Sequence, residues 1–174
     1  KEALALLDMH PEYKNGSAIV IGGNHWHHGV LGIVASRISN MFCKPTILIS
    51  IEEGECRGSG RSVAGVSLHN ALNACSELLI KFGGHDLAAG ISILPENIEA
   101  FREKLNAELS ADMEDYVPVL NIDFEVKPEE LTMEQVRSLD IMEPYGKSNE
   151  EPIMRINRCK ISKIIPIGNN CHTK

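Results

Sequence analysis

Apolar positions recur along this chain with two different periods, which predict strands and helices in alternation. Short apolar or β-branched runs are typical of buried strands, and they occur at 17–21, 46–51 and 90–94, with a further strand expected near 56–62. Apolar residues spaced three or four positions apart predict helices at 29–42, 68–82 and 96–109. This alternation predicts an α/β fold in which a compact mixed β-sheet is flanked by helices.

Local signals mark the ends of the predicted helices. In the helix at 29–42 the apolar residues at helical spacing are Val30, Ile33, Val34, Ile38 and Met41, and Lys44-Pro45 ends it. Ser67 is a candidate N-cap for the helix at 68–82, and Gly83 is the candidate left-handed residue that stops it. Residues 1–7 are interpreted as the tail of a helix.

A second region follows an acidic stretch at 110–116, which we interpret as a linker. Residues 120–126 alternate between apolar and polar, as in a half-buried strand. Thr132 and Gln135 form a capping box that predicts a short helix extending to Met142, and 153–167 is rich in strand-forming residues. We therefore expect the end of a connecting helix and its linker at 1–16, an α/β domain at 17–110 and a β-rich domain at 117–174.

Composition places this chain among globular proteins without disulfides. It has 174 residues, of which 43% are hydrophobic, so it can bury a core. No apolar run approaches the roughly 18 residues of a membrane helix. Five cysteines without a CxxC pair favour a reduced, cytoplasmic setting. Because the chain begins with lysine and shows no signal peptide, we expect a segment of a longer protein.

The charge balance is acidic overall and basic in places. A net charge of −7 argues against nucleic-acid binding, because phosphate contacts need lysine or arginine. However, no acidic residue follows Glu151, whereas this last stretch contains Arg155, Arg158, Lys160, Lys163 and Lys174. Since local charge decides where an anion docks, nucleic-acid binding stays open.

Residues 57–62, RGSGRS, contain the groups that a phosphate pocket requires. Arg57 and Arg61 carry positive charge in a forked donor geometry, and Ser59 and Ser62 supply hydroxyl groups among exposed backbone amides. A surface turn with two solvated arginines is the alternative interpretation.

A second candidate is the stretch at 81–90, KFGGHDLAAG. Gly83 and Gly84 would let a ligand approach the main chain, and His85 could donate a hydrogen bond to a phosphate oxygen. The alternative is a helix C-cap whose histidine bonds a nearby carbonyl. We expect 57–62 and 83–85 to meet at one end of the sheet, with the helix at 68–82 between them.

A third candidate is the histidine cluster of 24–37, NHWHHGVLGIVASR. His25, His27 and His28 invite a metal hypothesis, but they have no cysteine or carboxylate partner at a suitable spacing. The favoured interpretation is that His27 and Gly29 shape a strand-to-helix turn while Trp26 packs as a lid or stacks on a base.

Taken together, WHHGVLGIVASRI, KPTILIS, GSGRS and FGGHDLAAG resemble the DHHA1 half of the RecJ family, within the DHH/DHHA1 phosphoesterase superfamily. The resemblance extends from Ala18 to about Leu109. Further along, LDIMEPYGKSNEEP at 139–152 is similar to the signature that opens the RecJ oligonucleotide-binding domain, with departures at Ser148 and Glu151. The chain is thereby expected to hold the DHHA1 domain and the first part of that OB-like domain.

This resemblance implies a role in degrading single-stranded DNA from the 5′ end, in repair and recombination. It implies that Mn²⁺ or Mg²⁺ is held by an N-terminal DHH domain of the same polypeptide, so no metal site and no nuclease activity are expected within these residues. No contact with a membrane is expected either. The substrate phosphate and its cleft are assigned by the matched motifs to Arg57, Ser59, Gly60, Arg61, Ser62, Gly83, Gly84 and His85, with Trp26 and His27 as secondary candidates.

Two alternatives for function remain. One is a nanoRNase or cyclic-dinucleotide phosphodiesterase of the same superfamily, which shares the SxRS and GGH elements but commonly ends soon after the DHHA1 domain. The other is a non-catalytic scaffold that binds nucleic acid or a protein partner. The region beyond residue 117 favours a longer strand as substrate.

Overall fold

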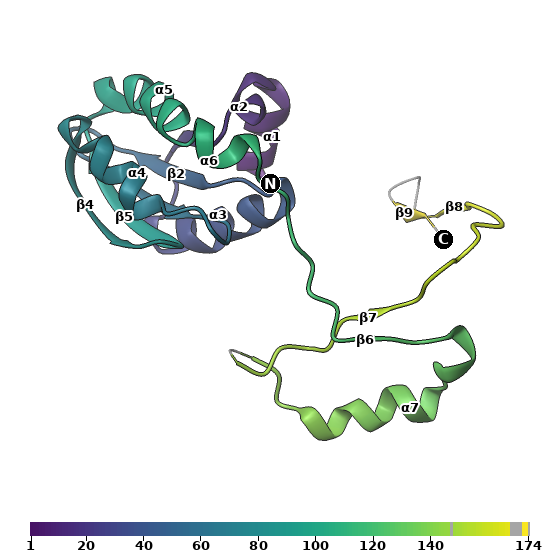
Figure 1. Cartoon of the computed structure of the whole chain (residues 1–174). Coiled ribbons are helices and arrows are strands. Elements are labelled where there is room, and N and C mark those ends of the chain that lie inside the picture. The colour runs from purple at the N-terminus through teal and green to yellow at the C-terminus, as the bar shows by residue number, and fades with distance from the viewer. Residues whose placement is uncertain (147, 168–171, 174) are drawn as a thin grey trace. The chain divides into compact units, whose positions relative to one another are not determined.

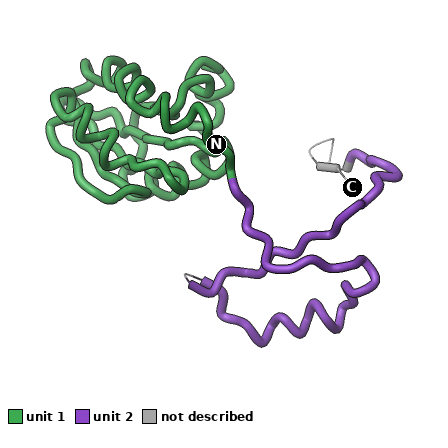
Figure 2. Tube along the Cα trace, in the orientation of Figure 1, with its two compact units in different colours: residues 1–118 green, residues 119–174 purple. Residues whose placement is uncertain are grey.

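The structure is a computed structural model that describes residues 1–146, 148–167 and 172–173 (Figure 1). It divides into two compact units, Lys1–Pro118 and Val119–Lys174 (Figure 2). Each unit is considered by itself.

The first unit is built on a five-stranded mixed sheet. Its strand order is β1-β2-β3-β5-β4, with β1 and β2 parallel and every other neighbouring pair antiparallel. The strands span Ile19–Asn24 (β1), Thr46–Ile51 (β2), Cys56–Arg61 (β3), Leu79–His85 (β4) and Ala88–Ile93 (β5). The predicted α/β class with a compact mixed sheet is confirmed.

Helices cover the two faces of this sheet, as Figure 1 shows for α3 and α5. They span Glu2–Met9 (α1), Glu12–Asn15 (α2), His28–Phe42 (α3), Leu68–Ala74 (α4), Ile98–Glu108 (α5) and Ser110–Glu114 (α6), with single 3₁₀ turns η1 at Ser76–Leu78 and η2 at Pro95–Asn97. One core lies between α4, α5 and the sheet, around Phe101 and Leu72. The other lies between α1, α3 and the sheet, around Leu7 and Leu31.

Helix α3 buries a different stripe from the one that the sequence pattern picked out. Of the apolar positions named for this helix only Ile38 is buried, whereas Val30, Ile33 and Met41 are among its exposed side chains. The buried stripe is Leu31, Ala35, Ile38 and Ser39. Both stripes have helical spacing, so periodicity could not tell which one faces the sheet.

The predicted helix at 68–82 is wrong in its second half. Helix α4 ends at Ala74, and after η1 the chain enters the strand β4, which pairs with β5 through a tight hairpin at Asp86-Leu87. Apolar residues at 78, 79 and 82 fit either element, and the hydrogen bonds offered by β5 decide for the strand. Gly83 is therefore a strand residue and ends no helix.

The expected linker at 110–116 is also part of the first unit. It forms α6, and Met113 and Tyr116 pack against the core that α4 and α5 share with the sheet. The division between the units falls after Pro118.

The second unit contains short elements. Strand β6 (Phe124–Glu125) pairs in parallel with β7 (Met154–Arg155), and β8 (Pro166–Ile167) pairs with β9 (His172–Thr173). The turn η3 (Pro128–Glu130), helix α7 (Met133–Ser138) and turn η4 (Leu139–Met142) lie between β6 and β7 along the chain. The predicted capping box of Thr132 and Gln135 is confirmed. The strand expected at 120–126 is reduced to two residues, and Leu120 is exposed.

Candidate functional site

The strands β3, β5 and β4 bring two of the three candidate motifs onto one face of the sheet. Directly opposed residues of antiparallel strands point to the same face, so the register defines three rows across these strands. We call them the Arg61 row (Arg61, Ala88, His85), the glycine row (Ser59, Gly90, Gly83) and the Arg57 row (Arg57, Ser92, Lys81). Together these nine residues form what we call the open face.

The contacts of nearby glycines show which face this is. A methyl group added to Gly32 of α3 would lie 2.7 Å from Arg61 Nη2 and 3.1 Å from Ser59 Oγ, so both side chains project toward α3. A methyl group added to Gly58 would instead lie 2.7 Å from Ile91 Cγ1, in the core on the other face. Helix α3 lies over β2 and β3, whereas Gly83 on β4 and Gly90 on β5 are exposed.

Arg61 is held in place by neutral acceptors. Its Nη1 donates a hydrogen bond to the Gly60 carbonyl oxygen at 2.7 Å and a longer one to Ser59 Oγ at 3.4 Å. None of the five ion pairs found among the described residues includes Arg61. Its charge is therefore positioned without being neutralised, which suits the binding of an anion.

His85 lies in the same row as Arg61. Both residues are opposite Ala88, one on β4 and the other on β3. Two strand spacings separate them, about 10 Å between Cα atoms. The expected convergence of the two motifs thus has a basis in the register, although it is produced by a hairpin and not by a long helix.

A cavity of about 500 Å³ lies over the other two rows. Three of the residues expected at the site line it, namely Arg57, Ser59 and Gly83, whereas Arg61 and His85 lie outside its lining. Sequence analysis missed Lys81, Ser92 and His28, which also line it. The alternation of Lys81, Gly83 and His85 would have indicated that they share a face, had β4 been recognised as a strand.

The remaining residues of the two motifs have roles inside the fold. A methyl group on Gly60 would lie 2.7 Å from Leu68 Cδ2, so this glycine faces the core. Ser62 Oγ donates to the Val66 carbonyl oxygen at 2.8 Å. Gly84 has a φ of 148°, and a methyl group there would lie 2.2 Å from the Ala88 carbonyl oxygen, so only glycine fits.

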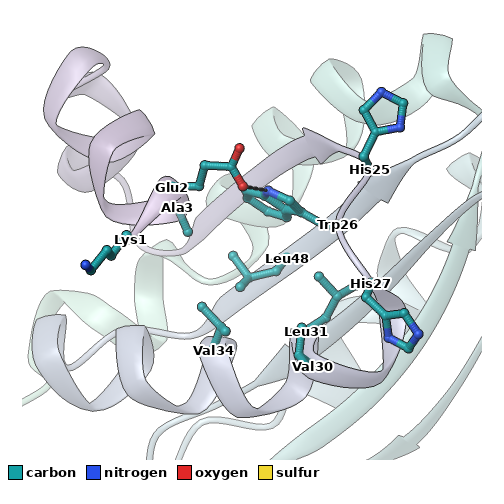
Figure 3. A pocket seen from close by; sticks show the side chains of 10 residues that line it. All are labelled: Lys1, Glu2, Ala3, His25, Trp26, His27, Val30, Leu31, Val34 and Leu48. Atoms are coloured by element: carbon teal, nitrogen blue, oxygen red, sulfur yellow. Dashed lines mark hydrogen bonds between the residues drawn. The ribbon is translucent and has the colours of Figure 1, made fainter.

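Trp26 and His27 lie elsewhere, around a second cavity of about 280 Å³ between α1 and the start of α3 (Figure 3). Trp26 Nε1 donates to Glu2 Oε2 at 3.0 Å. His27 Nδ1 accepts from the Gly29 amide at 3.1 Å and so caps α3. The interpretation of His27 as a residue that shapes the turn is confirmed, and neither residue lines the cavity of the open face.

Comparison with known proteins identifies the family. Residues 15–111, more than half of the chain, match the DHHA1 domain. The chain belongs to the DHHA1 domain family. Residues 122–174 match the RecJ OB domain, so an OB segment of RecJ type follows the DHHA1 domain. Every residue of the open face lies within the DHHA1 match.

Curated relatives of this DHHA1 protein carry the name single-stranded-DNA-specific exonuclease RecJ. The one from Bacillus subtilis is 34% identical over 163 residues, which cover 91% of this chain and 21% of the relative. The one from Escherichia coli is 33% identical over 135 residues, which cover 74% and 23%. The chain thus spans about a fifth of the length of these relatives.

Solved structures agree with this assignment. RecJ from Thermus thermophilus, in complex with Mn²⁺, superposes with a TM-score of 0.70 at 33% identity, covering 88% of this chain and 23% of that one. A second structure of the same protein, in complex with Mg²⁺, gives a TM-score of 0.65.

The described residues of this DHHA1 protein do not form a site for a metal ion. Within the described ranges, no group of three or more His, Cys, Asp or Glu side chains is arranged to hold a metal. The alternative of a site formed by His25, His27 and His28 is therefore not supported. The described helices also include none that is long and apolar enough to cross a membrane.

Proposed function

We propose that the open face binds the phosphate backbone of single-stranded DNA, as the substrate-binding part of a RecJ-type exonuclease. The observation that carries this proposal is that Gly83 and Gly90 both have room for a side chain in the described structure. A methyl group on Gly83 would meet no atom of the described structure within 4 Å, and one on Gly90 would meet only the Gly58 carbonyl oxygen at 3.9 Å. Glycine is poorly suited to strands, so its presence at these exposed positions suits the close approach of a ligand.

The charged residues around these glycines suit a phosphodiester. Arg61 offers a guanidinium group fixed by Gly60 and Ser59, and His85 offers a ring that can donate a hydrogen bond from the other side of the row. Arg57 extends the positive charge along β3. In this proposal Gly60, Ser62 and Gly84 shape the two strands, and Ser59 and Gly83 contact the ligand.

The chemistry of hydrolysis is assigned to another part of the polypeptide. We propose that an N-terminal DHH domain holds Mn²⁺ or Mg²⁺ and cleaves the strand from its 5′ end, in the cytoplasm and in the service of DNA repair and recombination. The DHHA1 domain would hold the nucleotide phosphate, and the OB segment from 117 onward would bind the strand further along. The chain alone would be inactive as a nuclease.

Binding of fluorescently labelled oligothymidylate and of a duplex of equal length tests this proposal. Wild-type protein should prefer the single strand, and its affinity should fall as salt is added. Arg61→Gln should weaken binding by about 2–4 kcal/mol if the phosphate loses a charge-assisted partner in a desolvated contact.

Arg37→Gln is the matched control for this change. Arg37 is exposed and lies five residues after Gly32 on α3, about 140° around the helix from the position that faces Arg61. It should bind like the wild type. Equal affinity of the Arg61→Gln protein would refute the proposal, and equally tight binding of dinucleotides and long strands would favour the short-substrate phosphodiesterase.

A further inference from the structure

The Arg57 row is a second cluster of positive charge on the open face. Arg57 on β3 and Lys81 on β4 are both opposite Ser92 of β5. Both cationic side chains are exposed, whereas Ser92 is 3% exposed and lies in the floor between them. Two strand spacings separate the cations, about 10 Å between Cα atoms, so their long side chains can converge on one group above Ser92.

No ion pair in the described part of the chain balances these two charges. The ion pairs of the described residues join other groups, and neither Arg57 nor Lys81 takes part in them. The chain as a whole is acidic, with a net charge of −7, whereas these two cations share one row of the sheet and neither is in an ion pair among the described residues. Such a pair favours an anionic ligand.

The shape of the surface agrees with the charge. The cavity of about 500 Å³ is lined by Arg57, Ser92 and Lys81, and His28, the first residue of α3, also lines it. Helix α3 has 15 residues, so the positive end of its dipole adds to the attraction for an anion at this place. The lining of the cavity thus includes the whole Arg57 row, whereas Arg61 and His85 lie outside it.

The distance between the two cationic rows is too large for one phosphate. Arg57 and Arg61 are four residues apart on β3, which corresponds to about 13 Å along the strand. The glycine row lies between them and leaves the sheet surface free of side chains at Gly83 and Gly90. An extended ligand with a phosphate at each end of this path fits the arrangement.

We propose that Arg57, Lys81 and Ser92 form a second phosphate subsite, which contacts a different phosphate of the same strand from the one at Arg61 and His85. This inference rests on the proposed function, because it takes single-stranded DNA as the ligand. It identifies Lys81 and Ser92 as binding residues and implies that the first subsite alone can accommodate a mononucleotide.

The test is binding of 5′-phosphorylated oligothymidylates of increasing length, from the mononucleotide to the octanucleotide, to Arg57→Gln and Lys81→Gln proteins. Each change should weaken octanucleotide binding on the order of tenfold, because the phosphate then has one charge-assisted hydrogen bond fewer. The slope of log affinity against log salt should become less negative by about 0.7 for each phosphate that is no longer neutralised. The gain in affinity on lengthening the ligand should shrink accordingly.

Lys104→Gln serves as the matched control. Lys104 is on α5, which covers the opposite face of the sheet, and its removal changes the net charge by the same amount. It should leave both the affinity and the salt slope at their wild-type values. Thermal unfolding of all variants shows whether the exposed substitutions leave the fold intact.

The outcomes separate this inference from the function on which it rests. If Arg61→Gln weakens octanucleotide binding while Arg57→Gln and Lys81→Gln keep wild-type affinity and salt slope, the second subsite is refuted and the function stands. If wild-type protein shows no preference for single strands, the function itself fails and the subsite fails with it.

Discussion

Substitution of Gly90 by alanine should affect the stability of the fold and the affinity for DNA in opposite directions. The added methyl group would meet only the Gly58 carbonyl oxygen, at the comfortable distance of 3.9 Å. Glycine costs roughly 0.5–1 kcal/mol relative to alanine within a strand, chiefly through the entropy of the unfolded chain. The Gly90→Ala protein should therefore unfold at the same temperature as the wild type or at a higher one.

Binding should change in the opposite direction. If the DNA backbone lies against the glycine row, the methyl group occupies space that the ligand needs, and such overpacking costs typically 1–3 kcal/mol. This corresponds to an affinity about 5- to 150-fold lower. Thermal unfolding followed by circular dichroism measures the first effect, and fluorescence anisotropy with labelled oligothymidylate at fixed salt measures the second.

Gly58→Ala is the matched control, because Gly58 is one strand over and faces the core. Its methyl group would lie 2.7 Å from Ile91 Cγ1 and should destabilise the protein by about 1–3 kcal/mol. The protein that remains folded should bind DNA as the wild type does. A Gly90→Ala protein that is stable and keeps wild-type affinity would show that the ligand does not approach the glycine row.

Three further predictions concern the rest of the molecule. Trp26→Phe removes the hydrogen bond to Glu2 and should lower stability by about 1 kcal/mol, yet change DNA affinity far less than Arg61→Gln does, as unfolding and anisotropy titrations would reveal. Burial raises the pKa of the Cys75 thiol to about 11, above its value in the unfolded chain. The stability that the neutral thiol contributes is therefore complete below about pH 8.5 and is lost as the pH rises through 11. Denaturant unfolding from about pH 8 to 11 should show this loss of stability, and the loss should be smaller in the Cys75→Ala protein. Phe101→Ala leaves a cavity in the core beneath α5 and should cost about 3–5 kcal/mol in urea unfolding, a loss that a conservative Phe101→Leu change should largely avoid.

Because β4 is a strand and not the end of a helix, the candidate site is assembled differently from what the sequence predicted. A helix ending at Gly83 would have delivered His85 to the end of the sheet as part of a loop. The hairpin instead places Lys81, Gly83 and His85 on one face, each aligned with a residue of β3 through β5. The candidate site is consequently a surface made of rows across three strands, and its extent is set by strand register.

The candidate residues of one motif lie on two different faces of the sheet, which the motif itself did not indicate. In RGSGRS the strand period of two sends Arg57, Ser59 and Arg61 to the open face and Gly58 and Gly60 to the core. The motif marks the residues as a unit, but their chemical roles differ because neighbouring strand residues point in opposite directions. Once β3 was placed as a strand, this division could be predicted, whereas the partners across the sheet could not.

The sequence by itself determined the alternation of strands and helices, the capping box at Thr132 and the presence of two candidate phosphate-binding motifs, because these depend on residues close together along the chain. The tertiary structure alone decided that 79–85 is a strand, which stripe of α3 is buried, and that Lys81 and Arg57 lie in one row on either side of Ser92. Apolar spacing in these segments fits more than one element. The choice is made by hydrogen bonds and packing with partners distant in sequence, which no local pattern contains.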